Sequence, residues 1–325
     1  MMRRLRQLHW VAAVLLAVAC GPKAIADPPA DKLPREPADG RPGSEFLRLA
    51  VDEQRKQPSA LEAAIVTYVP QDCGKTSPRV DLIAAVHIAD KSYYEELNRR
   101  FAGYDAVLYE LVAPKGTRVT PGAARSDHPV SALQVGLTRV LDLTFQLDVI
   151  DYSKRNMIHA DMSPRQLAES MEKRGESFWT ILVRMMAHAM AQQDNNSVSD
   201  AQLLAALLNK NRALALKRIM AAQFRDLEGS INAVEGPKGS ALVSDRNKVA
   251  LAELRKAIDG KKKKIAIFYG AAHMPDLQKR LKEDFELAPT ETQWLTAWNL
   301  KDRKPTPPAK PRPKAGKTPV APRRG

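Results

Sequence analysis

The chain has 325 residues, only two of them cysteines, and a formal net charge of +14. Most of the charge lies at the ends, because residues 1–26 carry +4 and residues 301–325 carry +8, which leaves +2 for residues 27–300. A body so close to neutral does not favour a nucleic-acid-binding domain, so no nucleic-acid partner is expected. Two cysteines, Cys20 and Cys73, also exclude a disulfide framework and a cysteine-rich metal site.

The N-terminus has the pattern of an export signal. Three arginines among the first six residues precede an apolar run, Trp10–Ala19, which is too short to span a bilayer in the mature protein. The run leads into Leu16–Cys20, which resembles a lipobox and would make Cys20 the lipidated first residue. The competing interpretation is cleavage by ordinary signal peptidase after Ala26. The small residue before the cysteine favours the lipobox.

These features predict an extracytoplasmic protein that is attached to a membrane by a lipid on Cys20. Because Gly21 rather than Asp follows the cysteine, we expect outer-membrane sorting in a Gram-negative envelope. Cleavage after Ala26 would instead release a soluble periplasmic or secreted protein.

Composition divides the chain into four regions. A signal peptide, 1–20, precedes a Pro- and Gly-rich tether, 21–43, and residues 44–300 fit one domain. The tail, 301–325, is rich in Pro, Lys and Arg. Both the tether and the tail contain too little apolar surface to offset the entropy of ordering, so we expect them to be disordered.

Hydrophobic periodicity within the body alternates between strand and helix patterns. In chain order we expect a strand over Ala63–Val69, a strand over Val80–Val86, a helix over Lys91–Phe101, a strand over Ala106–Leu111, helices over Ser131–Asp148, from Ser163, over Ser177–Gln192, Asp200–Leu208, Ala213–Leu227 and Ala241–Ile258, a strand over Lys264–Tyr269, a helix over Asp276–Asp284 and a strand over Gln293–Trp298. Strand–helix units at both ends, with helices between them, predict an α/β (α+β) fold with a mixed central sheet and a large helical insertion.

A strand–His–helix unit occurs twice. In Ile83–Asp90 and in Tyr269–Asp276 an apolar strand ends in small residues and a histidine, and an Asp that can cap the next helix follows three residues later. His87 and His273 therefore lie at the carboxyl ends of strands, where α/β proteins usually bind ligands. Glu110 ends another strand in the same manner.

Two imidazoles and one carboxylate are a suitable ligand set for a divalent transition metal, with positions left open for water. His87, Glu110 and His273 are the candidate ligands. The alternatives are that the histidines are structural and that Glu110 is a solvated charge at a strand end. No compact metal motif such as H-E-x-x-H accompanies them.

The same residues resemble the pattern of the TraB/GumN family, whose animal relatives are the Tiki proteins. Its first G-x-x-H motif is similar to Ala84–His87, with Ala84 in place of the glycine, and its second is similar to Gly270–His273. Its glutamate corresponds to Glu110, and its Arg-Asn pair to Arg246 and Asn247. The resemblance covers roughly residues 60–300 and is weakest through the helical middle.

The resemblance implies a Tiki-like fold, related to the erythromycin esterase and ChaN-like groups, built from two strand–GxxH–helix units. It also implies a metal-dependent hydrolase that acts on a peptide or a small-molecule substrate. Glu110 would be a third ligand or the general base, and Arg246 would stabilise an oxyanion or orient the substrate. Asn247 would donate a hydrogen bond. If the glycine of the family motif allows a close approach of the backbone, the methyl group of Ala84 would hinder that approach.

Several alternatives remain at this point. Arg246 could instead pair with an acidic neighbour on the surface of its helix, and Asn247 could be a cap. His159 and Asp161 are candidate accessory ligands or substrate contacts, or else Asp161 belongs to the turn that starts the helix at Ser163. At the level of the whole protein, the rival to a hydrolase is a non-catalytic envelope lipoprotein that binds a peptide or haem.

Overall fold

The computed structural model describes residues 46–54, 56–71, 77–119, 141–177, 180, 200–235 and 239–302. The predicted signal peptide, Cys20 and the tether lie outside these residues, as do nearly all of the tail and of the predicted helix Ser177–Gln192.

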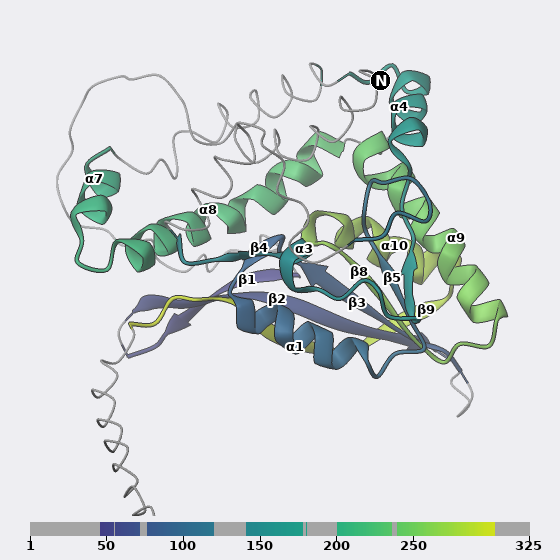
Figure 1. Ribbon diagram of the computed structural model, residues 1–325, viewed down its shortest axis with the longest axis horizontal. Helices are drawn as coiled ribbons and strands as arrows, with labels where there is room; N and C mark the ends of the chain where they lie inside the picture. Colours follow the sequence, from purple (N-terminus) through teal and green to yellow (C-terminus); the bar gives the residue numbers. More distant parts are fainter. Residues whose placement is uncertain are drawn as a thin grey trace, which may run out of the picture.

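The described part of the chain forms a mixed sheet of seven strands, with helices against it (Figure 1). The strands are β1 (Leu47–Asp52), β2 (Gln57–Pro70), β3 (Arg79–Ala85), β5 (Ala106–Tyr109), β7 (Met157–His159), β8 (Lys264–Gly270) and β9 (Leu287–Asn299). Their order is β1-β2-β3-β8-β5-β7, and β9 also pairs with β2. A separate two-stranded ladder joins β4 (Ile88–Ala89) to β6 (Thr144–Phe145). The predicted α/β (α+β) class with a mixed central sheet is thus confirmed.

One half of the sheet is parallel. Strands β3, β8, β5 and β7 run in the same direction, and β3 and β8 are buried along almost their entire length. Strands of a parallel sheet are covered on both faces, which explains their continuous apolar sequences. The two strand–His–helix units are neighbours here, because Ala84 pairs with Tyr269 and Ala85 with Gly270. All four carboxyl ends therefore meet at one edge of the sheet.

The other half is antiparallel and is built on β2. This strand of 14 residues pairs with β1 through its first part and with β3 through its second, while β9 follows its other edge from Ala60 to Pro70. One long strand thereby joins the N-terminal hairpin, the parallel strands and the last strand of the domain into one sheet.

Helices cover both faces of the sheet, with α1 on one side and α9 and α10 on the other in Figure 1. Connections between parallel strands are right-handed, so the direction in which the chain crosses the sheet decides which face the helix covers. The chain crosses in one direction from β3 through α1 to β5 and in the opposite direction from β7 through α9 to β8, which places the two helices on opposite faces. Among the described residues the helices are α1 (Lys91–Phe101), the one-turn α3 (Gln146–Val149), α4 (Pro164–Lys173), α7 (Asp200–Leu208), α8 (Arg212–Glu235), α9 (Arg246–Asp259) and α10 (Met274–Asp284). A π-helical turn, Ala241–Asp245, leads into α9, and a 3-10 turn, Ala271–His273, leads into α10.

The helix predicted over Ser131–Asp148 is wrong in the part that the structure describes. Leu141 is still helical, but the helix ends there, Thr144 and Phe145 form β6, and Gln146–Val149 is a separate helical turn. The short strand exists because it pairs with β4, directly after His87, which is a long-range contact that local periodicity does not reveal.

The predicted capping residues are correct in one case and wrong in two. Ser163 and Gln166 form the expected capping box of α4. Asp90 stands at the N-cap of α1, but its carboxylate accepts hydrogen bonds from Lys217 and from the backbone N–H of Asn299 instead of capping the helix. Asp276 lies within the first turn of α10, since His273 is the residue at its N-cap.

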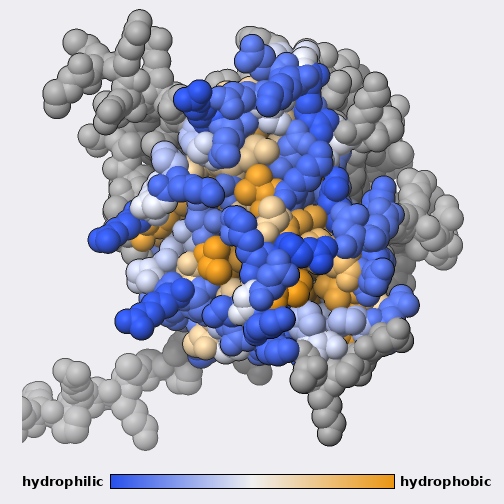
Figure 2. All heavy atoms as spheres, turned by 90° about the vertical axis from the view of Figure 1, so that its right-hand side faces the viewer, coloured by the Kyte–Doolittle hydropathy of each residue, from blue (hydrophilic) through white to orange (hydrophobic). Residues whose placement is uncertain are grey.

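The face of the molecule on which α9 lies is largely hydrophilic, with smaller hydrophobic areas between the polar side chains (Figure 2). Within the described ranges, no helix combines the length and the apolar character that crossing a membrane requires.

Candidate active site

Four parallel strands deliver one polar side chain each to the same edge of the sheet. His87 follows β3, Glu110 follows β5, Asp161 follows β7, and His273 follows β8. This is the edge at which α/β folds bind ligands. His87, Glu110 and His273 belong to the predicted metal site, and the structure brings all three together with Arg246.

Arg246 lies at the centre of this group, with its side chain only 10% exposed. Nε and Nη2 donate to the two carboxylate oxygens of Asp161 at 2.9 and 2.7 Å, and Nη2 also donates to Glu110 Oε1 at 2.6 Å. Nη1 contacts the carbonyl oxygen of Leu242 and His273 Nε2, both at 3.3 Å. Each of the five N–H groups of the guanidinium therefore has an acceptor.

The position of Arg246 is set by the turn that precedes it. Asp245, the last residue of the π-helical turn, accepts hydrogen bonds from Ser170 at 2.6 Å and from Arg174 at 2.5 and 2.7 Å. Arg174 also contacts the carbonyl oxygen of Gly239. These contacts from α4 fix the start of α9, and Arg246 projects inward from its first turn. Single π-turns of this kind are frequent at functional sites.

Glu110 is held from both sides. Its Oε1 accepts from Arg246, and its Oε2 accepts from the backbone N–H of Gly270 at 2.7 Å. Burial alone would raise the pKa of this carboxyl, but the charge of Arg246 and the contacts with His273 and His87 outweigh burial and hold the pKa well below its ordinary value. Glu110 is therefore ionised at neutral pH. Burial would lower the pKa of Arg246, yet the Glu110 and Asp161 carboxylates raise it.

The tautomer of His273 is determined by Asn247. Asn247 Nδ2 donates to the carbonyl oxygen of His273 at 3.1 Å and to Asp276 at 2.8 Å, so its Oδ1 must face His273 Nδ1, 2.8 Å away. Nδ1 then carries the proton, and the lone pair of Nε2 is directed into the site. This Nε2 lies 3.6 Å from Glu110 Oε1. In metal-binding histidines, the ring nitrogen that does not bind the metal usually donates its N–H to an oxygen, as Nδ1 of His273 does to the amide oxygen of Asn247.

His87 has a similar support from a different element. Its Nδ1 lies 3.1 Å from Gln146 Oε1, and Gln146 Nε2 donates to the hydroxyl of Tyr152 at 2.7 Å. With the amide oriented in this way, Nε2 of His87 also presents a lone pair. A Cβ on Gly270 would lie 3.2 Å from this Nε2 and 3.2 Å from Glu110 Oε2. The missing side chain at Gly270 is thus what lets these two groups approach the strand.

Of the two accessory candidates, only one lies in the site, and both residues of the Arg-Asn pair are buried. Asp161 is 1% exposed and belongs to the site, whereas His159 Nε2 contacts the carbonyl oxygen of Leu111 at 2.6 Å and takes no part. Arg246 is not a surface residue of its helix, and Asn247, at 0% exposure, is not a solvated cap.

Ala84 does not take the place of a glycine next to the site. It is buried within β3, pairs with Tyr269, and its carbonyl oxygen accepts a hydrogen bond from Tyr93. The close approach of backbone and side chains occurs one position further along, at Gly270.

Gln146, Tyr152 and the amide of Gly270 were not predicted from the sequence. Gln146 falls inside an apparently regular helical pattern, and a single glutamine there carries no chemical signature. The signal that could have found it is the expected burial of a polar side chain on an apolar face.

The donor types suit a divalent metal, but their observed spacing does not form a closed metal site. Among the described residues, no group of three or more His, Cys, Asp and Glu side chains is arranged so that it could hold an ion. The guanidinium of Arg246 contacts both Glu110 Oε1 and His273 Nε2, which are two of the three predicted ligand atoms. The third, His87 Nε2, and the other oxygen of Glu110 would each lie 3.2 Å from a Cβ on Gly270.

The amino-acid sequence and the fold were compared with known proteins. No family model, no curated protein and no solved structure matches this chain.

Proposed function

We propose that this protein is a metal-dependent hydrolase of the TraB/GumN type that works outside the cytoplasm. One observation carries the proposal: two histidines, His273 buried and His87 exposed, each turn Nδ1 toward an amide oxygen and bring Nε2 near the same carboxylate, at the carboxyl edge of a parallel sheet. His87, Glu110 and His273 would hold a divalent transition metal. When bound, such an ion polarises a carbonyl group and lowers the pKa of water.

The contacts of Glu110 favour the role of a ligand over that of a general base. A base must gain a proton near neutral pH, and the pKa of Glu110 is held well below its ordinary value by Arg246 and the histidines despite burial. Its charge is instead suited to balancing a cation. Each oxygen accepts one hydrogen bond in this structure and retains a second lone pair.

The Arg-Asn pair is suited to positioning rather than to direct contact with substrate. Four of the five donors of Arg246 are taken by Asp161, Glu110 and Leu242, and the fifth faces His273 Nε2, so its role is to keep Glu110 ionised and in place. Asn247 uses both parts of its amide to fix the tautomer of His273. This differs from the oxyanion stabilisation and substrate hydrogen bond expected from the sequence.

The proposed substrate class and the proposed cellular location are inferred from the sequence alone. The resemblance favours a peptide, whose C–N bond would be cleaved by water with the proton passing to the amine that leaves, and a small amide or ester is the alternative. The signal and Cys20 favour an outer-membrane lipoprotein. We expect the Cys20→Ser variant to be absent from the membrane fraction, which fractionation of cells that express it would measure.

Metal analysis tests the proposal directly. We expect the purified full chain, grown with zinc, manganese or cobalt, to retain a stoichiometric ion, and the His87→Ala/His273→Ala variant to retain only background. His159→Ala is the matched control, because this histidine contacts a backbone carbonyl outside the site, and it should retain the ion. Circular dichroism verifies folding of each variant.

The proposal fails if the wild-type chain carries no stoichiometric metal, or if the double variant binds it unchanged. A haem absorption band in the purified protein would favour the binding-protein alternative. Products from a peptide library, identified by mass spectrometry, would then define the substrate class.

A further inference from the structure

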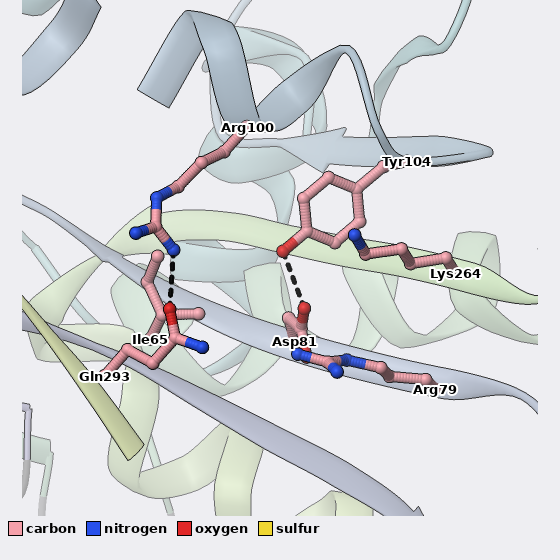
Figure 3. Close-up of a pocket in the computed structure, with 7 residues that line it drawn as sticks. All are labelled: Ile65, Arg79, Asp81, Arg100, Tyr104, Lys264 and Gln293. Carbon is pink, nitrogen blue, oxygen red and sulfur yellow. Dashed lines mark hydrogen bonds and ion pairs between the residues drawn. The ribbon is translucent and has the colours of Figure 1, made fainter. Parts of the chain in front are cut away.

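A cavity of about 290 Å³ lies at the edge of the sheet opposite to the candidate active site. It opens where β3 and β8 begin, beside the end of α1. Three cationic side chains from three different elements line it: Arg79 from β3, Arg100 from α1 and Lys264 from β8 (Figure 3). Its size is at the lower end of the range for small-molecule sites, so it would hold a compact ligand.

The carboxylate that lines this cavity is already neutralised. Asp81 is 1% exposed, and its Oδ1 accepts from Thr67 Oγ1 at 2.7 Å and from Arg79 Nε at 3.0 Å. Its Oδ2 accepts from the hydroxyl of Tyr104 at 2.6 Å. These three donors occupy Asp81, so it does not compete for the other cations of the cavity.

Lys264 is the cation that this arrangement leaves without an anionic partner. Its Nζ lies over the ring of Tyr104, 4.6 Å from the centroid, and within the described residues it forms no ion pair or side-chain hydrogen bond. Arg100 uses Nε on Glu96 and Nη1 on Gln293, which leaves Nη2 without an acceptor among the described residues. In Figure 3, Arg100 and Lys264 lie on opposite sides of Tyr104, with Arg100 directed toward Gln293 and Lys264 toward the tyrosine ring.

The surroundings of the cavity add further positive charge. The exposed run Lys261–Lys263 leads directly into Lys264. The nearby carboxylates all have partners: Glu96 pairs with Arg99 and with Arg100 of the cavity, Asp105 accepts the backbone N–H groups of Lys263 and Lys264, and Glu291 accepts from Gln293. Cations around the mouth therefore outnumber carboxylates, and such a field attracts anions.

We propose that this cavity binds a phosphoryl group. A tetrahedral anion offers several acceptor oxygens in different directions, which suits donors that converge from β3, α1 and β8. Arginine and lysine are the side chains that bind phosphate most often. The group belongs either to a soluble phosphate or phosphorylated molecule, or to the headgroup of an anionic phospholipid. This site is separate from His87, Glu110 and His273 and does not depend on the proposed hydrolase activity.

Calorimetric titration with inorganic phosphate tests the site on the full chain carrying Cys20→Ser, which lacks the acyl anchor. We expect binding that Arg100→Gln and Lys264→Met each weaken by about tenfold or more, as loss of a charge-assisted hydrogen bond predicts. Arg99→Gln is the matched control, since Arg99 neighbours Arg100 and also pairs with Glu96 but does not line the cavity. Lys264→Met keeps the apolar stem against Tyr104, so it should fold normally.

Flotation with phosphatidylcholine vesicles, with and without phosphatidylglycerol, distinguishes the two sources of the group. Binding of free phosphate assigns a soluble ligand, and variant-sensitive binding restricted to the anionic vesicles assigns a headgroup. The basic tail is present in every variant, so the comparison isolates the cavity. The proposal is overturned if neither probe binds, or if Arg99→Gln weakens binding as much as Arg100→Gln does.

Discussion

At the scale of single residues, the most constrained side chain is Arg246. Its charge is buried between Glu110 and Asp161, with Asp161 bonded through both oxygens. Taking three charges out of water is costly, and only complete pairing offsets the cost. Loss of one partner therefore leaves an uncompensated charge that the protein cannot solvate.

Asp161→Asn is expected to lower the free energy of unfolding by about 3–5 kcal/mol, the range for a broken buried ion pair. The asparagine keeps the shape of the side chain but loses the charge opposite Arg246. Urea denaturation at neutral pH measures the change. Glu169→Gln, which breaks the exposed pair with Arg165, is the control and should leave stability unchanged. Equal effects of the two substitutions would contradict the buried network.

The pH dependence of stability should reflect Glu110. Because its pKa lies well below the ordinary value of 4.5 in the folded state, folding favours the ionised form. The stabilisation is complete above the unfolded pKa and is lost as the pH falls through the folded pKa. Denaturation free energies measured from neutral pH downward should therefore decline below about pH 4.5.

Glu110→Gln is expected to make that acid-side decline shallower, because the glutamine has no proton to gain. Part of the slope remains, since the pKa of Asp245 is also lowered by its contact with Arg174. Glu253→Gln, which removes the pairing with Lys256 on α9, serves as the comparison. An unchanged slope in Glu110→Gln would mean that Glu110 is not ionised preferentially in the folded state.

At the scale of elements, the two strand–His–helix units could be predicted from the sequence, but the segment that orients His87 could not. Apolar runs that end in small residues identify β3 and β8, and α1 and α7 begin and end where the periodicity predicts. The two-residue strands β4 and β6 exist only through each other, and the single turn of α3 follows from them. Gln146 lies in that segment, so the support of His87 depends on a pairing that no local pattern encodes.

The end of β8 gives an element-scale prediction. A methyl group on Gly270 would lie 3.2 Å from both Glu110 Oε2 and His87 Nε2, which is tighter than ordinary contact. Gly270→Ala should therefore push these two groups apart and lower metal affinity at least tenfold, with a smaller effect on stability. Metal titration and thermal melting of the same samples separate the two effects.

The corresponding control is Gly103→Ala, where the new Cβ would meet a backbone oxygen at 3.4 Å and Lys264 Nζ at 3.6 Å but no residue of the candidate active site. Metal affinity should be unchanged in this variant. If Gly270→Ala binds metal as the wild type does, the close approach at Gly270 is not what shapes the site.

At the scale of the whole molecule, the sequence predicts the class but not the order of the strands. Strands at both ends with helices between them indicate a mixed sheet. That β2 is long enough to pair with β1, β3 and β9 depends on register and on bulges, which side-chain patterns do not specify. The site, by contrast, follows from one topological rule once the parallel order β3-β8-β5-β7 is known.

The insertion between the strand–helix units is attached to the sheet through Lys217 of α8. Its Nζ donates to Asp90 at 2.7 Å with only 6% of the side chain exposed, and Asp90 also accepts the N–H of Asn299 at the end of β9. This carboxylate thus joins the insertion, the start of α1 and the last strand. Removing the cation leaves Asp90 partly buried with one donor.

Lys217→Met is accordingly expected to lower the free energy of unfolding by about 1–3 kcal/mol, because a charged hydrogen bond is lost while the methionine still fills the space. Opening should begin in the insertion, so proteolysis within residues 200–235 should accelerate more than cleavage elsewhere. Lys210→Met, on an exposed turn, should change neither measurement. Uniform acceleration of cleavage throughout the domain would show instead that the insertion and the sheet unfold as one cooperative unit.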